Sequence, residues 1–245
     1  MRLPRRLAAV AALLPESGGV ADIGTDHGLI PVYLAKAGRY VPIVATDINE
    51  GPLLRAESNC QRHSVRDKVS FRKGDGLAPL NPGEVGTVII AGMGEATIVE
   101  ILKSHRQKAE TFTTFILQPM DGAEELRRFI WQLDWCINAE SVVLERRKFY
   151  QTIRVLPHGH FRVPRSVQEN HVGLSQEEVV TLGALLLERK DPDFARMIEE
   201  RLKSRLATRS HIIAGSGGKH RERLRELDQE ITKLKKVMKW LSSGT

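Results

Sequence analysis

The chain has 245 residues, of which 41% are hydrophobic and 27% are charged, close to the average for globular proteins. Its 20 glycines and 11 prolines are too few for a low-complexity or collagen-like chain, and its apolar runs are shorter than the ~20 residues that span a bilayer. Composition therefore excludes disordered, fibrous and membrane-spanning classes. Cys60 and Cys136 lie far apart, and no His/Cys cluster has zinc-ligand spacing. We accordingly expect no disulfide, no metal site and a cytoplasmic location.

The positive charge is concentrated toward the C-terminus. Residues 1–158 carry 20 Lys and Arg against 18 Asp and Glu, whereas residues 159–245 carry 17 against 12. This asymmetry is expected of an element that contacts a polyanion such as RNA. The solvated face of a helical hairpin has a similar composition, so charge alone leaves both interpretations open.

The N-terminal segment combines Arg2, Arg5 and Arg6 with the apolar run Leu7–Leu14 and so imitates a signal peptide. The apolar run continues directly into a strand and a glycine-rich turn, without an A-x-A-like cleavage site. We therefore expect an N-terminal helix that packs on the domain.

From Val20 to about Leu156, short β-branched runs alternate with amphipathic stretches, which predicts an α/β fold with a parallel sheet covered by helices on both faces. The predicted strands are residues 20–23, 43–46, 69–71, 88–91 and 114–117.

A helix near Ala123–Leu133 is followed by two strand-like runs, Ile137–Leu144 and Thr152–Leu156. Because no helix separates these two strands, they predict an antiparallel hairpin that closes the sheet. The basic run Arg146-Arg147-Lys148 and the following Phe149-Tyr150 are expected to connect them.

Pro157, Gly159 and Pro164 mark a linker, so we expect one domain at residues 1–158 and a helical domain at residues 159–245. A helix over Gln176–Arg189 is predicted, with Ser175 and Glu178 as its capping box.

A second helix is expected after Pro192, and a turn at Gly215–Gly218 leads into a third. Apolar residues in the third helix recur at steps of 3 and 4, which predicts an antiparallel coiled-coil hairpin. This seam comprises Leu224, Leu227, Ile231, Leu234, Met238 and Leu241. The basic residues of the hairpin, among them Arg201, Arg205 and Arg209, are candidate RNA contacts, and self-association through the seam is an alternative use.

The segment Asp22-Ile23-Gly24-Thr25-Asp26-His27-Gly28 follows the first predicted strand and opens a helix, as a nucleotide-cofactor turn does. In a dinucleotide site, a glycine at the position of Asp26 lets the backbone approach the pyrophosphate, and a carboxylate there would repel phosphate. S-adenosylmethionine has no phosphate and carries a positive sulfonium. The turn therefore favours S-adenosylmethionine over NAD.

Two further acidic residues follow the next strands in the chain. Asp47, after the second strand, can accept hydrogen bonds from both ribose hydroxyls, and Asp75, in Gly74-Asp75-Gly76, can accept one from the adenine amino group. Each residue alone also suits an ordinary turn. Carboxylates at three successive strand ends lie where open α/β sheets bind their ligands, which favours a cofactor site.

The fourth predicted strand ends in Ala91-Gly92-Met93-Gly94 and the fifth in Leu117-Gln118-Pro119-Met120. Together with the turn D-I-G-T-D-H-G and the segment G-D-G-L, these motifs resemble the bacterial tRNA (adenine-22)-N1-methyltransferases, over essentially the whole chain. That family joins a class I, Rossmann-like methyltransferase domain to a C-terminal coiled-coil domain.

The resemblance implies methyl transfer from S-adenosylmethionine to N1 of adenosine 22 in tRNA, with Asp26 as the catalytic residue and no metal. The residues expected to bind the cofactor are Asp22, Gly24, His27, Asp47, Ile48, Asp75, Gly76, Ala91, Gly92 and Met93. Those expected to contact the RNA are Arg5, Arg6, Gln118, Pro119, Arg146, Arg147 and Lys148.

Two positions depart from the family pattern. Glu95 stands where a glycine commonly follows A-G-M-G, and Met120 stands where an Asn commonly follows L-Q-P, which removes an amide that could contact the base. A small-molecule methyltransferase and a non-catalytic RNA-binding protein that retains the cofactor fold are the alternatives. An NAD-dependent oxidoreductase ranks last because Asp26 stands in the glycine-rich turn where a pyrophosphate would bind.

Overall fold

The computed structural model describes residues 2–168, 172–215 and 221–243. The chain divides into two compact units, residues 1–162 and 163–245. The Gly215–Gly218 turn predicted from the sequence lies mostly outside the described residues.

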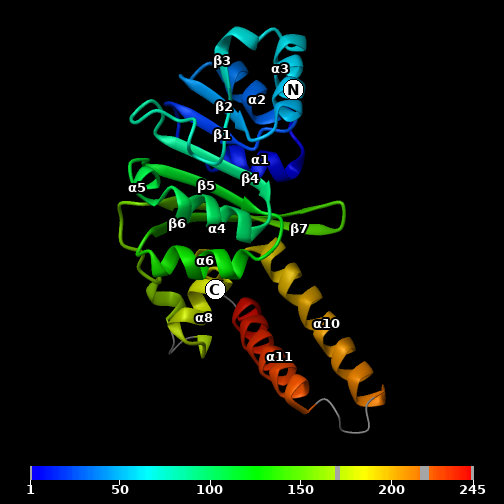
Figure 1. Cartoon of the computed structure of the whole chain (residues 1–245). Coiled ribbons are helices and arrows are strands. Elements are labelled where there is room, and N and C mark those ends of the chain that lie inside the picture. The colour runs from blue at the N-terminus through cyan, green and yellow to red at the C-terminus, as the bar shows by residue number, and fades with distance from the viewer. Residues whose placement is uncertain (1, 169–171, 216–220, 244–245) are drawn as a thin grey trace. The chain divides into compact units, whose positions relative to one another are not determined.

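The first unit is a seven-stranded sheet in the order β3-β2-β1-β4-β5-β7-β6 (Figure 1). Five strands are parallel to one another, and β7 is antiparallel to both β5 and β6. The strands are β1 (Val20–Ile23), β2 (Ile43–Asp47), β3 (Val69–Lys73), β4 (Thr87–Met93), β5 (Thr114–Pro119), β6 (Cys136–Glu145) and β7 (Lys148–Leu156). The predicted α/β fold with a closing hairpin is confirmed.

Helices cover both faces of this sheet. Figure 1 shows α4 and α6 on one face and α1 and α2 on the other. The helices are α1 (Arg5–Ala12), α2 (Leu29–Ala37), α3 (Glu50–Arg62), α4 (Glu95–Ser104), α5 (Arg106–Ala109) and α6 (Ala123–Gln132). Because both faces are covered, the central strands do not alternate between buried and exposed residues, and every residue of β1 and β5 is buried.

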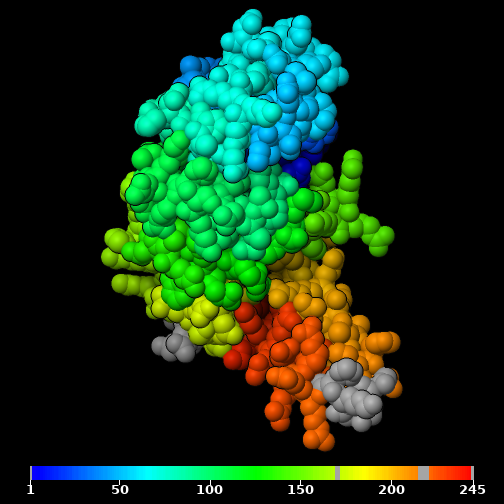
Figure 2. Space-filling model, viewed as in Figure 1, coloured from blue at the N-terminus to red at the C-terminus, as the bar shows by residue number. Residues whose placement is uncertain are grey.

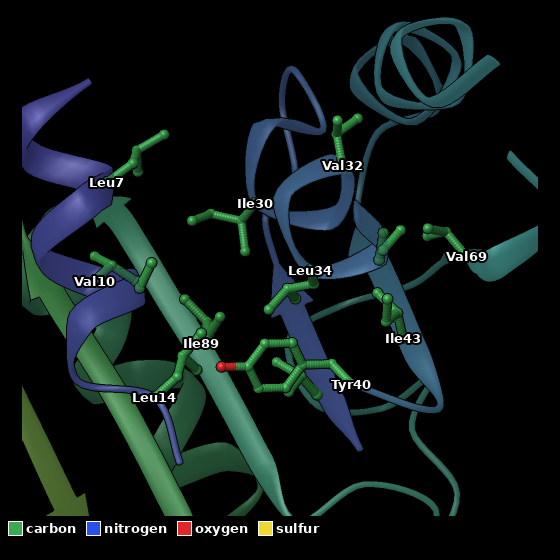
Figure 3. Packing of buried hydrophobic residues seen from close by; sticks show 14 of the residues in the cluster. Leu7, Val10, Leu14, Ile30, Val32, Leu34, Tyr40, Ile43, Val69 and Ile89 are labelled. Atoms are coloured by element: carbon green, nitrogen blue, oxygen red, sulfur yellow. The ribbon is translucent and has the colours of Figure 1, made fainter. Parts of the chain in front are cut away.

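The expected N-terminal helix is α1, which packs against the sheet. Leu7, Val10 and Leu14 meet Ile30 of α2 and Ile89 of β4 in one buried cluster (Figure 3). Burying such side chains contributes about 1.5–3 kcal/mol each. This packing anchors the N-terminal segment, including its arginines, beside the ends of β4 and β5.

The hairpin of β6 and β7 is longer than the sequence predicts. Lys148, Phe149 and Tyr150 belong to β7 and pair with β6, so only Arg146 and Arg147 form the turn. The prediction was wrong here because a two-residue turn with positive φ at both residues, 46° and 67°, lets pairing continue to the tip. In Figure 2 the tip of this hairpin projects from the surface of the first unit.

In the second unit, the helix predicted over Gln176–Arg189 is interrupted. Ser175 and Glu178 form the expected capping box, but α8 (Gln176–Leu182) ends at Gly183, and α9 (Ala184–Glu188) follows. Gly183 has a φ of 116°, outside the helical range, and this conformation breaks the single helix that periodicity predicts.

The last two helices, α10 (Pro192–Gly215) and α11 (Arg221–Ser242), pack against each other as an antiparallel hairpin (Figure 1). Leu227, Ile231 and Leu234 are buried as predicted, whereas Val237 takes the buried position expected for Met238. Self-association through this seam stays a prediction.

Acidic residues of α11 neutralise several arginines of α10. Arg201 and Arg205 both pair with Glu230, at 2.7 and 2.8 Å, and Arg209 pairs with Asp228 at 2.6 Å. These pairs are partly exposed and add little to stability, so contact of these arginines with RNA stays a prediction.

Candidate functional site

Two cavities open at the carboxyl ends of the central strands, where the chain order reverses between β1 and β4. A ligand crevice is expected at this point in an open α/β sheet. The Asp47 cavity, of about 470 Å³, is lined by Ile23, Gly24, Thr46, Asp47, Ile48, Gly74, Asp75, Gly76, Met93, Ala96, Thr97, Glu100 and Ile101. The Asp26 cavity, of about 200 Å³, is lined by Arg6, Leu7, Asp22, Gly24, Thr25, Asp26, His27, Gly28, Leu29, Ile30, Ala91 and Gly92. Gly24 lies in both linings, so the two cavities adjoin.

The Asp47 cavity combines apolar walls with a polar rim. Ile48, Met93 and Ile101 supply apolar surface of the kind that encloses a flat base, and the Asp47 and Asp75 carboxylates stand on the rim. Thr46 is fully buried, and its hydroxyl has no hydrogen-bond partner among the residues that the structure describes. A buried hydroxyl without a partner is costly, so the cavity suits a ligand with polar groups.

Two glycines of this cavity leave space that a side chain would fill. Gly24 has a φ of 74°, and a methyl group added to it would overlap the end of the Met93 side chain. Gly76 has a φ of 48°, and the same methyl group would lie 3.1 Å from Ile101 and His105. Both positions favour glycine for backbone conformation and for space. The carboxylate acceptors, the apolar walls and these glycines fit an adenosine-containing cofactor.

Asp26 lies in the exposed turn between β1 and α2. Its Oδ1 accepts a hydrogen bond of 3.1 Å from Arg55 Nε and a second one from Arg55 Nη2, and its Oδ2 lies 3.2 Å from His27 Nε2. The Asn59 side chain donates to the carbonyl oxygen of His27 at 2.8 Å and so fixes the turn to α3. Asp26 is therefore held in place while its carboxylate stays accessible, with 54% of its side chain exposed.

Asp22 behaves differently because it is buried. It lies in β1, paired with Ala45 of β2 and Ile89 of β4, and is 7% exposed. Desolvation by burial, with a smaller contribution from the charge of Asp47, raises the pKa of Asp22 from 3.8 to about 7. Asp22 thus lines the Asp26 cavity as a group that is partly protonated near neutral pH.

The Arg6 guanidinium forms one wall of the Asp26 cavity. Its Nη1 donates to Gln118 Oε1 at 2.8 Å, and the Gln118 amide donates to the carbonyl oxygen of Pro119 at 2.6 Å. The backbone N–H of Arg6 donates to Glu145 at 2.7 Å. Gln118 and Pro119 are buried, so the expectation that they contact RNA directly is wrong: Gln118 faces Arg6 inside the protein.

The structure gathers most of the predicted residues at the two cavities. Six of the expected cofactor residues line the Asp47 cavity: Gly24, Asp47, Ile48, Asp75, Gly76 and Met93. Asp22, His27, Ala91 and Gly92 line the Asp26 cavity with Asp26 itself. Arg5 is exposed on α1, and Arg146, Arg147 and Lys148 lie at the β6–β7 tip, outside both linings.

The two departures from the family pattern also have a place in the structure. Glu95 begins α4, and its side chain packs over Gly122, where an added methyl group would lie 2.6 Å from Glu95 Cβ. Met120 is 44% exposed and donates its backbone N–H to Met93 at 2.8 Å. The main chain at this position is thus fixed to the end of β4 whatever the side chain.

Helices α4 and α3 contribute residues to the site that were not predicted from the sequence. Ala96, Thr97, Glu100 and Ile101 of α4 line the Asp47 cavity, and Arg55 of α3 binds Asp26. The A-G-M-G motif, which places the start of α4 beside the cavity, was the available signal for the first group. No pattern in the sequence indicates Arg55.

Comparison with known proteins agrees with this geometry. Residues 3–153 match the family described as a methyltransferase domain. The tRNA (adenine(22)-N(1))-methyltransferase of Bacillus subtilis strain 168 is 28% identical over 239 residues, which cover 97% of this chain and 98% of that protein.

Solved structures agree over the same length. The B. subtilis m1A22 tRNA methyltransferase TrmK is 26% identical with a TM-score of 0.80, covering 97% of this chain and 99% of that one. Streptococcus pneumoniae Sp1610, crystallised with S-adenosyl-L-methionine, is 25% identical with a TM-score of 0.80, covering 97% and 100%. Since the family match extends over more than half of its length, the chain belongs to the methyltransferase domain family.

Proposed function

We propose that this chain is an S-adenosylmethionine-dependent tRNA methyltransferase that modifies N1 of adenosine 22. The observation that carries the proposal is the junction of the two cavities at Gly24, which gives a cofactor and a base adjoining places at the end of β1. The full-length similarity to the B. subtilis enzyme supports tRNA as substrate and N1 as target. Action on tRNA agrees with the expected cytoplasmic location.

The Asp47 cavity would hold the cofactor, with Asp47 and Asp75 as hydrogen-bond acceptors on its rim and Ile48, Met93 and Ile101 as its apolar walls. When bound, S-adenosylmethionine supplies an electrophilic methyl group on a sulfonium. Asp22, buried at the strand end, and His27 and Gly92 in the adjoining lining would complete the site.

Asp26 would act on the target base. N1 of adenine has a lone pair at neutral pH, so the protein needs no base to create the nucleophile and must mainly position it. After transfer the ring carries a positive charge, which the exposed Asp26 carboxylate stabilises, or relieves by accepting a proton from the exocyclic amine. Arg55 and His27 hold Asp26 in position for this role.

The tRNA would approach across the β6–β7 hairpin and α1. N1 lies on the Watson–Crick edge, so the adenosine must be unpaired or turned out of its stack, at a cost of about a few kcal/mol. Exposed cations at Arg5, Arg146, Arg147 and Lys148 offset this cost through phosphate contacts. Arg6, held by Gln118, lines the Asp26 cavity.

The test is transfer from labelled S-adenosylmethionine to unmodified bacterial tRNA, with a tRNA in which adenosine 22 is replaced by guanosine as the control. Transfer that depends on adenosine 22 is the expected result. Equal transfer to both tRNAs would place the target elsewhere, and no transfer to either would refute the proposed substrate.

Asp26→Asn tests the catalytic residue. We expect cofactor affinity to be retained and the single-turnover rate to fall about a hundredfold or more, since a positioned acid–base or electrostatic group contributes on that scale. Asp67→Asn removes an exposed carboxylate ahead of β3 and is the matched control. An unchanged rate in Asp26→Asn would remove Asp26 from the mechanism.

A further inference from the structure

A third cavity, the Arg62 groove, lies beside the Asp26 cavity and has no role in the proposed chemistry. It has a volume of about 600 Å³ and is lined by His27, Leu29, Leu54, Arg55, Ser58, Asn59 and Arg62. His27 and Leu29 also line the Asp26 cavity, so the groove begins where the target base would lie. Its other residues come from one face of α3.

The lining of the Arg62 groove is cationic. Arg55 and Arg62 are both exposed, and no carboxylate is among the described residues that line it. Arg62 Nη2 donates to the neutral Asn59 Oδ1 at 3.3 Å, so its charge is not neutralised by that contact. Arg55 pairs with Asp26, and an ion pair between exposed groups is weak enough to be shared with an incoming anion.

The groove also offers groups that suit a nucleotide in preference to a bare anion. The Leu54 side chain is 57% exposed at its edge and presents an apolar surface to a sugar or base. Ser58 adds a hydroxyl on the same face of α3. Arginine guanidinium groups match the geometry of phosphate oxygens.

We infer that the Arg62 groove binds the phosphate of a nucleotide that flanks the target adenosine. This inference rests on the proposed tRNA substrate and adds a contact region on α3 to those on α1 and the β6–β7 hairpin. Arg62 carries the phosphate contact, and Arg55 joins it while holding Asp26.

A hydrogen-bonded path connects the phosphate site to the catalytic turn. Arg62 binds the Asn59 side chain, and the Asn59 side chain binds the carbonyl oxygen of His27, next to Asp26. Asn59 is 8% exposed and therefore well fixed. A flanking phosphate held at Arg62 is thus kept at a fixed position relative to the Asp26 carboxylate. The target base is then positioned between the two groups.

The experiment measures tRNA affinity at several salt concentrations for the full chain and for Arg62→Ala, Arg62→Lys and Lys36→Ala. Lys36 is an exposed cation of α2 outside the groove lining and is the matched control. We expect Arg62→Ala to weaken binding about tenfold, as loss of a hydrogen bond to a charged group does. Its salt slope should fall by about 0.7–0.9, the value for one phosphate contact. Arg62→Lys should keep the salt slope, and cofactor affinity should stay unchanged in every variant.

A neutral phosphate analogue locates the contact. An RNA with a methylphosphonate on one side of adenosine 22 should weaken binding to the full chain as Arg62→Ala does, and the two changes together should cost no more than either alone. Arg62→Ala behaving like Lys36→Ala, while the full chain still methylates tRNA, would overturn the phosphate site alone. Failure of the full chain to bind or methylate tRNA would overturn both the site and the proposed function.

Discussion

Asp22→Asn should make the fold more stable at alkaline pH and change its pH dependence. Burial raises the pKa of Asp22 in the folded protein to about 7, from 3.8. Between these two values the folded protein retains a proton that the unfolded chain has released, so the unfolding free energy falls as pH rises. Each pH unit costs about 1.4 kcal/mol, which gives about 4 kcal/mol across the whole interval. The amide of the variant has no charge to bury and avoids this loss.

The measurement is urea unfolding of both proteins from pH 4 to pH 8, without cofactor. The difference in unfolding free energy, variant minus parent, should rise across this range and level off above pH 7. Asp67→Asn, which changes an exposed carboxylate, should show no such rise. A difference that stays flat between pH 4 and pH 7 would refute the claim that burial raises the pKa of Asp22 in the folded protein.

Two other substitutions test the cavity and the buried charges. Gly24→Ala should lower cofactor affinity, measured by calorimetry, because the added methyl group pushes Met93 into the Asp47 cavity. The control is Gly83→Ala, because Gly83 has the same φ of 74° and open space around it. This control variant should lower only the stability of the fold. Equal affinities in these two variants would refute the role given to Met93. Arg127→Met should lower the unfolding free energy by about 3–5 kcal/mol, because it removes the guanidinium that pairs with the buried Glu140 carboxylate at 2.6 Å. Adding Glu140→Leu should restore much of this loss. Retained stability in the single variant would show that Glu140 finds another partner.

Local patterns in the sequence were sufficient to predict most of the fold. The β1 and β2 segments are short apolar runs followed by turn residues, and such runs are typical of strands buried on both faces. The errors occurred where backbone conformation overrides composition. Periodicity predicts one helix through Gly183, and a basic run suggests a loop at Lys148, although the Arg146–Arg147 turn lets the pairing of β6 and β7 continue.

The site was predictable only in part, for a physical reason. Asp22 and Asp47 lie near the carboxyl ends of β1 and β2, and Asp75 follows β3, so topology alone brings them to one edge of the sheet. Arg55 and Arg62 lie on α3, and their distance from Asp26 depends on how that helix packs on the sheet, which no local pattern encodes. The L-Q-P motif marks Gln118 in the sequence, but its burial behind Arg6 follows from the packing of α1.

The turn between β6 and β7 has a consequence for how this protein could evolve or be engineered. Arg146 and Arg147 both adopt left-handed backbone conformations, which cost about 1–2 kcal/mol for each residue with a side chain and cost asparagine–glycine pairs much less. Selection for thermal stability alone would therefore remove both guanidinium groups from the projecting tip. A variant stabilised at this turn would gain melting temperature and lose affinity for RNA phosphates. A screen for heat resistance would therefore select against the proposed activity.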